Sequence, residues 1–213
     1  MGIVTILDYG SSNLRSVAKA LAAVSDPRTT ILVSDRAADL RRADRVVFPG
    51  QGAIGQCMDS LHRLGLAEVV AECARNRPYL GICLGLQSLM EGSEEDGGRD
   101  CIGVLPGRVV RFPGQLAGDD GARLKIPHMG WNQVRQARAH PLWNGIGDDQ
   151  YFYFVHSYYV APRLETDMAG STEYGVRFCA AVARDNLFAV QFHPEKSQQA
   201  GLRLLRNFLD WRP

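Results

Sequence analysis

The sequence predicts a single-domain α/β fold: a mixed, mainly parallel sheet flanked by helices, with added antiparallel strands in its C-terminal half. Three observations support it. In the first 90 residues short apolar runs alternate with segments of helical periodicity. Beyond residue 100, strand-like segments follow one another with only turns between them. The chain of 213 residues with 46 % hydrophobic content suits one core, so residues 1–213 are expected to form one domain.

The first half begins with the apolar run Ile3–Leu7, which ends at Asp8-Tyr9-Gly10 and predicts a buried strand followed by a turn. This alternation of strands and helices is typical of a parallel sheet wrapped by helices. Further strands are predicted at 29–33, 45–48 and 79–82, and helices at 13–24, 53–76 (broken near Gly65) and 84–90.

The second half reads as strands joined by turns and closed by an amphipathic helix at 197–211. Asp185-Asn186 is a suitable hairpin turn, which favours antiparallel pairing around it. The Gly- and Asp-rich segment 113–125 predicts an exposed loop. Strands are predicted at 101–112, 130–135, 151–160, 174–184 and 187–192.

Composition excludes several classes of protein. A formal charge of +1 gives no sign of a nucleic-acid partner. No apolar run is long enough to span a bilayer, and the N-terminal segment lacks the basic region of a signal peptide, so a cytoplasmic chain without a membrane partner is expected. The five cysteines form no Cys-x-x-Cys pair, which argues against disulfides and zinc. No metal or cofactor is expected.

The segment Gly81-Ile82-Cys83-Leu84-Gly85 has the pattern Gly-x-nucleophile-x-Gly, with cysteine where many hydrolases carry serine. A predicted strand precedes it and a predicted helix follows, as the motif requires. The N-terminus of that helix would stabilise negative charge on sulfur and bind a developing oxyanion. A lone cysteine at a helix start is more often structural, but the glycines and the strand-helix context favour a nucleophile.

The segment Phe192-His193-Pro194-Glu195 offers a base for that nucleophile. Residues two apart in an extended chain point to the same side, so the Glu195 carboxylate can orient the His193 ring. This is the base-plus-orienter arrangement of a nucleophile triad. Such pairs are also common on surfaces, and the functional interpretation depends on Cys83 needing a base.

Phe48-Pro49-Gly50-Gln51-Gly52 follows a predicted strand and resembles a glycine-rich anion-binding loop. Its glycines let backbone N–H groups approach a ligand closely. By itself the segment is only a turn, and neither a Walker pattern nor a dinucleotide fingerprint accompanies it.

Together, the motifs at 49–52, 81–87 and 192–195 resemble those of the class I glutamine amidotransferases, in the right order along the chain. The resemblance covers nearly the whole sequence. It is closest to the histidine-biosynthesis branch of that family, the glutaminase subunits of imidazole glycerol phosphate synthase. The segments that carry this closer resemblance are residues 8–14, 127–132 and 153–158.

The resemblance implies a Cys83, His193 and Glu195 triad that hydrolyses L-glutamine to glutamate and ammonia. It also implies a heterodimer with a (βα)₈-barrel cyclase, which would use the ammonia to make imidazole glycerol phosphate and aminoimidazole carboxamide ribotide. Ammonia is mostly protonated and non-nucleophilic at neutral pH, so a sheltered path into the partner makes physical sense.

The same resemblance assigns the remaining site residues. Gly50, Gln51, Gly52 and the N–H of Leu84 would line the oxyanion hole. Residues expected to hold the glutamine substrate are Gln87, Glu95, His156, Ser157 and Tyr158.

Two features depart from the family pattern, and two residues are assigned to the partner interface. Gln51 stands where the family usually carries a small apolar residue, and the loop 113–125 looks longer than usual. Lys196 would pair with an acidic residue of the barrel, although a solvated surface lysine is the plain alternative. Trp131 would lie near the partner, although buried packing explains it equally well.

Other functions remain open on the sequence alone. The nearest rival is the glutaminase subunit of another synthase, such as anthranilate synthase, although residues 127–132 are not expected there. A free-standing thiol hydrolase would show high turnover without a partner. A non-catalytic binding module is disfavoured because all three triad members are present.

Overall fold

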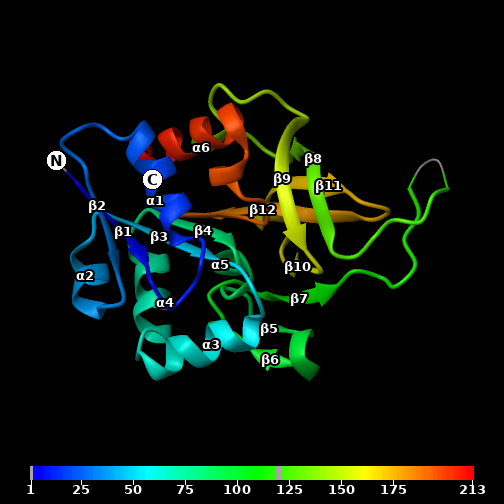
Figure 1. The fold of residues 1–213 in the computed structure, drawn as a ribbon, viewed down its shortest axis with the longest axis horizontal. Coiled ribbons are helices and arrows are strands. Elements are labelled where there is room, and N and C mark those ends of the chain that lie inside the picture. The colour runs from blue at the N-terminus through cyan, green and yellow to red at the C-terminus, as the bar shows by residue number, and fades with distance from the viewer. Residues whose placement is uncertain (1, 119–120) are drawn as a thin grey trace.

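A computed structural model describes residues 2–118 and 121–213 and contains one large mixed sheet with helices on both faces (Figure 1). The strands of this sheet are β1 (Ile3–Leu7), β2 (Thr30–Ser34), β3 (Arg45–Gly50), β4 (Tyr79–Cys83), β5 (Gly92–Ser93), β6 (Arg99–Asp100), β7 (Gly107–Arg111), β8 (His128–Gln136), β9 (Gln150–His156), β10 (Tyr158–Pro162), β11 (Met168–Glu173), β12 (Arg177–Arg184) and β13 (Leu187–Val190).

Helices cover the sheet, with α1 and α6 on one face and α3 and α4 on the other (Figure 1). The α-helices are α1 (Leu14–Val24), α2 (Ala37–Arg42), α3 (Ile54–Arg63), α4 (Ala67–Asn76), α5 (Leu84–Gln87) and α6 (Gln198–Asp210). Short 3₁₀ turns are η1 (Glu95–Gly97), η2 (Pro141–Trp143), η3 (Glu165–Asp167) and η4 (Pro194–Lys196).

One half of the sheet is parallel, in the order β2-β1-β3-β4-β13. Apart from the edge strand β2, its strands are largely buried on both faces, because side chains alternate between two cores. Val47 on β3 packs toward α1 and α6, whereas Val46 and Phe48 pack toward α3 and α4. The strands β3, β4 and β13 are parallel neighbours, so their carboxyl ends lie side by side, and the three motifs singled out in the sequence lie there.

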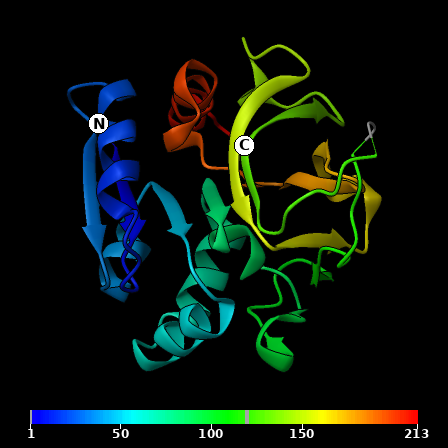
Figure 2. The ribbon, with the colours of Figure 1, turned by 45° about the vertical axis from the view of Figure 1, so that its right-hand side comes forward.

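The other half is largely antiparallel and begins at β12, which pairs with β13 through a two-residue turn. Asp185 in that turn has φ of 48°, a conformation that suits a tight hairpin. From β12 the sheet continues to β10 and β7 on one path and to β11, β8 and β9 on another. Figure 2 shows these strands curling on the right-hand side of the molecule, away from β1 and β2.

Most predicted elements are confirmed. The mixed sheet with flanking helices is present, β1 matches the predicted Ile3–Leu7, and the break near Gly65 separates α3 from α4. The Asp185-Asn186 turn joins β12 to β13 as expected. Residues 119 and 120 of the predicted loop 113–125 lie outside the described residues, and Ala117 pairs with Arg123 across it.

Several boundaries were predicted wrongly. The helix expected at 84–90 ends at Gln87, and the strand expected at 101–112 covers only Gly107–Arg111. One cause explains both: Ile102 N–H donates to the Ser88 carbonyl at 2.8 Å, so the segment after 101 caps the short helix instead of extending a strand. The expected strand 151–160 is two strands separated at Ser157.

The strand expected to begin at Tyr174 begins at Arg177, because Tyr174 N–H donates to the Val176 carbonyl in a turn at Gly175, which has φ of 66°.

Four short elements were not predicted from the sequence: α2, β5, β6 and β11. Helix α2 is short and rich in charge, so it lacks a strong apolar period. Strand β11 consists largely of small residues, and its burial comes from pairing with β12 and β8. The strands β5 and β6 have two residues each.

Across residues 2–118 and 121–213, the helices are too short and too polar to cross a membrane. Over the same part of the chain, no three or more His, Cys, Asp or Glu side chains gather as a metal site would require.

Candidate active site

Cys83 is the last residue of β4 and directly precedes α5, with a φ of 53° and ψ of −103°. A non-glycine residue with positive φ is strained, and such strain persists only where the surrounding structure enforces it. The turn holds the sulfur at the N-terminus of α5, and the side chain is only 5 % exposed. The backbone is thus the sharp strand-to-helix turn that presents a nucleophile.

The glycines on either side of Cys83 are required by close packing. A Cβ added to Gly85 would overlap the carbonyl oxygen of Phe48 on the neighbouring strand. A Cβ added to Gly81 would lie 2.6 Å from the Gly85 carbonyl and 2.9 Å from the Ala189 side chain. Both positions therefore exclude any larger residue, because real Cβ atoms do not approach so closely.

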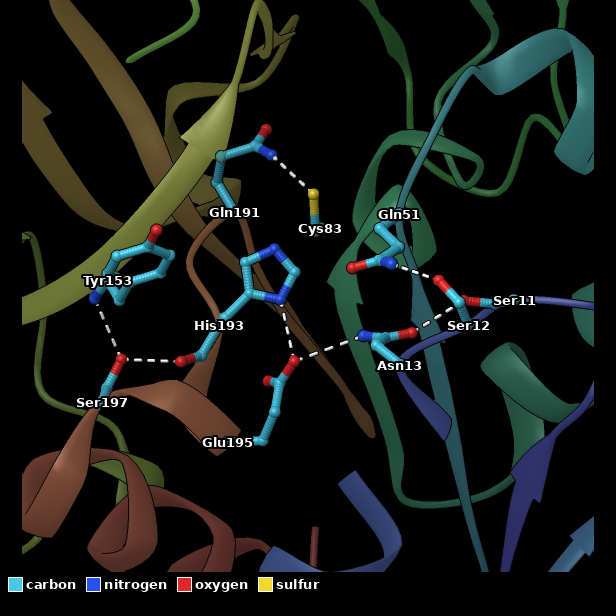
Figure 3. Close-up of polar contacts among 10 residues, drawn as sticks. All are labelled: Ser11, Ser12, Asn13, Gln51, Cys83, Tyr153, Gln191, His193, Glu195 and Ser197. Carbon is cyan, nitrogen blue, oxygen red and sulfur yellow. Dashed lines mark hydrogen bonds and ion pairs between the residues drawn. The ribbon is translucent and has the colours of Figure 1, made fainter. Parts of the chain in front are cut away.

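His193 and Glu195 follow β13, which lies beside β4. The Nδ1 atom of His193 is 2.9 Å from the Oε1 atom of Glu195, and both side chains are fully buried. Because a carboxylate only accepts, Nδ1 carries the proton. The other ring nitrogen, Nε2, is buried without a hydrogen-bond partner among the described residues, and in Figure 3 it points toward Cys83.

Burial and partner act in opposite directions on these two groups. Burial disfavours charge on the imidazole, but interactions with Cys83 and then Glu195 outweigh it and raise the pKa of His193 to about 10. Burial also opposes ionisation of Glu195, yet its hydrogen bond to His193 holds the pKa of that carboxyl below the usual value. The arrangement favours a protonated imidazole beside an ionised carboxylate.

Two residues of the turn after β1 and one residue between η4 and α6 support His193 and Glu195 (Figure 3). The side-chain amide of Asn13 donates to Glu195 Oε1 at 3.2 Å, and Ser11 donates to Asn13 at 2.7 Å. The hydroxyl of Ser197 donates to the His193 carbonyl at 2.6 Å. These contacts fix the carboxylate and the backbone of the base, as outer hydrogen bonds do in preorganised sites.

A further buried side chain, that of Gln191, reaches the sulfur of Cys83. The amide nitrogen Nε2 of Gln191 lies 3.5 Å from Cys83 Sγ, and its oxygen accepts a 3.1 Å bond from Gln87 Nε2. Gln191 was not predicted from the sequence. Its position two residues before His193 was a usable signal, since alternate residues of an extended segment share a side. Asn13 and Ser197 were also missed, and no local pattern indicated them.

A cavity of about 430 Å³ opens in front of Cys83. It is within the usual size range of small-molecule sites. The five residues that the sequence assigned to glutamine binding all line it, as do Cys83 and Leu84. A hollow of about 460 Å³ also lies between the start of β1 and the end of α6, but it contains none of the motif residues. The lining residues of the first cavity are Ser12, Gln51, Gly52, Cys83, Leu84, Gln87, Glu95, Pro127, Val155, His156, Ser157 and Tyr158.

Within this cavity Glu95 and His156 have distinct environments. Glu95 Oε2 accepts a 2.9 Å bond from the Ile54 N–H, and partial burial raises the pKa of its carboxyl. Burial lowers the pKa of His156 to about 3, so its ring is neutral. His156 Nδ1 is 2.8 Å from the Tyr158 carbonyl oxygen and therefore donates to it.

The predicted oxyanion loop lies at the end of β3, in register with the nucleophile: Gly50 pairs with Cys83. Gly50 packs so tightly that an added Cβ would lie 2.8 Å from the Leu84 side chain. Gly52 has φ of 102°, which strongly favours glycine. The Gln51 side chain turns toward the β1 turn and donates to the Ser12 hydroxyl (Figure 3).

The two residues assigned to a partner interface lie close together on the surface. Trp131 on β8 is 45 % exposed, so the packing alternative does not hold for it. The Trp131 ring contacts the Tyr153 ring of β9 edge-on, with 6.0 Å between the ring centres. The Lys196 ammonium lies 5.7 Å from the centre of the Tyr153 ring. Met129 and Tyr151 beside them are 62 % and 53 % exposed. These five residues are called the β8–β9 face below.

Comparisons with known proteins agree with this geometry. The family model described as "Glutamine amidotransferase class-I" matches residues 5–211. The chain is 56 % identical over 211 residues to the "Imidazole glycerol phosphate synthase subunit HisH" of Nitrosococcus oceani, covering 99 % of this chain and 98 % of that protein. A subunit of the same name from Nitrosomonas europaea is 56 % identical over 214 residues, the full length of both.

Solved structures show the same fold. A protein described as "Crystal structure of glutamine amidotransferase" superposes with a TM-score of 0.73 at 18 % identity, covering 98 % of both chains. A glutamine amidotransferase from Thermotoga maritima superposes with a TM-score of 0.62 at 14 % identity, covering 98 % of this chain and 83 % of that one.

Proposed function

The chain belongs to the class-I glutamine amidotransferases and, within them, to the HisH subunits of imidazole glycerol phosphate synthase, and from that premise we propose how its residues work. It is a glutaminase subunit serving histidine biosynthesis. Cys83 is the nucleophile, His193 the base, and Glu195 the group that orients the base. The chain acts in the cytoplasm and needs no metal or cofactor.

The observation that carries this proposal is the hydrogen bond from His193 Nδ1 to Glu195 beside a strained Cys83 turn. With Nδ1 protonated, only Nε2 can take the thiol proton, and Nε2 is the ring nitrogen directed at the sulfur. A surface His–Glu pair would have neither the burial nor this direction. The burial and direction of the pair therefore support its assignment to a triad.

The reaction begins with acyl transfer. The Cys83 thiolate attacks the carbonyl carbon of the glutamine side-chain amide, and the electron pair of the C=O bond moves to oxygen. The N–H groups of Leu84 and of the loop Gly50, Gln51 and Gly52 stabilise that oxyanion, at about 3–4 kcal/mol for each well-placed donor. Protonated His193 gives its proton to the departing nitrogen, the C–N bond breaks, and ammonia leaves.

Hydrolysis of the thioester completes the cycle. A water molecule gives a proton to neutral His193 Nε2 and adds to the thioester carbon, and the C–S bond then breaks to release glutamate and thiolate. The same histidine thus acts first as acid and then as base. Its raised pKa, about 10, favours the acid form that the first step needs, and Glu195 stabilises that form.

Gln87, Glu95, His156, Ser157 and Tyr158 hold the glutamine in this proposal. All five line the cavity before Cys83. Glu95 supplies the only carboxylate among the residues that line it, which suits the α-ammonium group of an amino acid. The amide of Gln87 has its nitrogen engaged with two acceptors, so its oxygen is the atom left for the substrate.

Ammonia released at Cys83 passes to a (βα)₈-barrel cyclase bound as a heterodimer. We place that partner on the β8–β9 face, because an exposed group of Met, Trp and Tyr side chains is unusual on a monomer surface. Trp and Tyr are also the residues most enriched in the centres of protein interfaces. Lys196 at the edge of the face meets an acidic residue of the barrel.

The test is Cys83→Ala assayed with the cyclase, using glutamine in one arm and an ammonium salt in the other. Glutamine-dependent synthesis should fall to background, because only that route needs the nucleophile, while ammonia-dependent synthesis stays at the wild-type rate. Cys101→Ala, a half-buried cysteine elsewhere, serves as the matched control and should support both routes. Survival of the glutamine route in Cys83→Ala would refute the assignment.

A further inference from the structure

Gln191 is a fully buried amide with no place in the triad or the oxyanion hole. Its Nε2 lies 3.5 Å from Cys83 Sγ, within hydrogen-bonding range for the large sulfur atom. Burying an amide is costly unless it is hydrogen-bonded, and an aliphatic side chain would fill the same space without that cost. A role for the amide itself is the physical alternative to simple packing.

The direction of the Gln191 amide is fixed by its neighbours, although the two ends of an amide look alike. Gln87 Nε2 is 3.0 Å from the Tyr158 carbonyl oxygen, which can only accept, so the nitrogen end of Gln87 is identified. The same nitrogen donates to Gln191 at 3.1 Å, so the atom it meets there is the oxygen. The nitrogen of Gln191 therefore faces the sulfur.

His156 is a second buried side chain that donates to the Tyr158 carbonyl, where this series of hydrogen bonds begins. The Tyr158 carbonyl also accepts from His156 Nδ1 at 2.8 Å, and His156 Nε2 lies 3.0 Å from His128 Nδ1. With His156 protonated on Nδ1, its Nε2 accepts the proton of His128. The Tyr158 carbonyl thus accepts from both His156 and Gln87, which holds the Gln87 nitrogen in place, so reversal of the Gln191 amide would break the bond with Gln87.

We propose that Gln191 is a catalytic residue that donates a hydrogen bond to the Cys83 sulfur whenever the sulfur carries negative charge, and that Gln87 is a positioning residue that keeps the donor turned toward it. The inference rests on the proposed function of Cys83. A hydrogen bond to a charged acceptor is stronger than one to a neutral acceptor, so this donor favours thiolate over thiol.

The donor acts at both ends of the reaction. Before the attack it increases the fraction of Cys83 present as thiolate and holds the sulfur in one position. In the second half the C–S bond breaks and the electron pair returns to sulfur, so the same donor stabilises the leaving group. His193, which has just taken the proton of the attacking water, also faces the sulfur, so the two donors stabilise the thiolate together.

The experiment measures Cys83 itself, without glutamine or partner. The full-length wild type and Gln191→Met, which keeps the side-chain length, are treated with iodoacetamide from pH 5.5 to 9, and the Cys83 adduct is quantified by peptide mapping. Gln191→Met should slow alkylation at pH 7 by about ten- to hundred-fold and move the midpoint of the pH profile upward. Wild-type rate and midpoint in a folded Gln191→Met chain would overturn the proposal.

Two controls keep the result interpretable. Gln136→Met removes an amide that donates to the Ile146 and Gly147 carbonyls away from the site, and its Cys83 profile should match wild type. If circular dichroism shows that Gln191→Met does not fold, Gln87→Met decides. It leaves Gln191 free to reverse, so alkylation should slow about two- to ten-fold, and an unchanged rate would overturn the proposal.

Failure of this inference can be told apart from failure of the proposed function. Loss of glutamine-dependent synthesis in Cys83→Ala together with normal alkylation in Gln191→Met removes only the role of Gln191. Slowed alkylation in Gln191→Met together with full glutamine-dependent synthesis in Cys83→Ala removes the nucleophile assignment instead. In the complex, Gln191→Met should lower kcat by about ten- to hundred-fold with little change in KM, because the donor acts on the sulfur and has no assigned contact with the bound glutamine.

Discussion

Two buried histidines near Cys83, His193 and His156, show that the neighbouring group decides whether a buried ring carries charge. His193, after β13, lies 2.9 Å from a carboxylate, and its pKa is raised to about 10. His156, at the end of β9, lies 3.0 Å from another histidine, and burial lowers its pKa to about 3. Both rings are hidden from solvent, so burial does not by itself set the charge.

The difference divides the site into two functions. A buried carboxylate stabilises the imidazolium, so His193 can hold a proton and donate it. Without a carboxylate the His128–His156 pair stays neutral and can only orient its hydrogen-bond partners. His193 thus carries the acid–base step, and His156 forms part of the cavity wall. Each prediction below changes one side of this contrast.

The largest effect is expected from Glu195→Gln, which gives His193 an uncharged neighbour like that of His156. The new amide can donate to Nδ1, which would place the ring proton on Nε2 and block removal of the thiol proton. Glutamine-dependent synthesis should fall by about 10²–10⁴-fold, the range seen when a triad orienter is neutralised. Initial rates with glutamine and with ammonium salt in the cyclase complex provide the measurement.

Ammonia-dependent synthesis should be preserved in Glu195→Gln, because that route bypasses the triad. Glu165→Gln, an exposed glutamate in η3, is the matched control and should retain both activities. A Glu195→Gln chain with wild-type glutaminase activity would show that His193 does not need its carboxylate, and the contrast with His156 would lose its functional meaning.

The next effect concerns selectivity among the cysteines. An electrophilic glutamine analogue should label Cys83 at least about 100-fold faster than any other cysteine at pH 8. Burial raises the pKa of the Cys57 and Cys179 thiols to about 12 and that of Cys101 to about 11, so these thiols carry little thiolate. Peptide mapping after a short exposure locates the adduct.

The Cys83→Ala chain provides the background for that experiment and should take up no label in the same time. An adduct on Cys101, the half-buried cysteine nearest the surface, would contradict the selectivity.

A smaller effect is expected in stability against acid. The pKa of His128 is lowered to about 4 and that of His156 to about 3, mainly by burial, whereas both titrate near 6.5 in the unfolded chain. Below pH 6.5 the unfolded chain binds more protons, so stability is complete above 6.5 and falls as pH decreases. Each histidine should cost about 2 kcal/mol at pH 5.

Urea unfolding at pH 8, 6 and 5 measures this slope. His128→Phe should lose less stability between pH 8 and 5 than wild type does, by about 2 kcal/mol, because one neutral histidine no longer titrates. His62→Gln changes an exposed histidine on α3 and should keep the wild-type slope. An identical slope in His128→Phe would mean that the pair is not held neutral, and the contrast with His193 would fail.

The smallest effect is expected from Lys196→Ala on the β8–β9 face. Exposed pairs contribute about 0–1 kcal/mol, so the melting temperature of the isolated chain should stay near wild type. In the complex, the ratio of glutamate released to product formed should rise by about two- to five-fold, the equivalent of one such pair. An unchanged ratio would leave Lys196 an ordinary surface lysine and weaken the docking face.

Activity without the partner gives a related comparison. The isolated chain should be a poor glutaminase, and a cyclase carrying its nucleotide ligand should raise the rate. Gly50 and Gly52 make a peptide reorientation in the oxyanion loop sterically accessible, so a switch can reside there. Glutamate release by the chain alone, compared with the ligand-bound complex, tests this expectation, and a full rate without partner would favour a free-standing hydrolase.

The sequence alone was sufficient where a feature depends on neighbours along the chain. The alternation of strand and helix, the glycines around Cys83, the two-residue spacing of His193 and Glu195, and the turn at Asp185 are all local patterns. Local sterics and period-two geometry determine them. For the same reason the sequence placed Cys83 correctly at the end of β4, directly before a helix.

Only the tertiary structure decided what depends on segments far apart in the sequence. The bond between Asn13 and Glu195, the approach of Gln191 to Cys83, and the neutral pair of His128 with His156 join residues from different segments of the chain. Helix propensity and hydrophobic period do not contain that information, because strand register and burial select such partners from the whole chain. The charge of each buried histidine was therefore set by the neighbour that folding placed beside it.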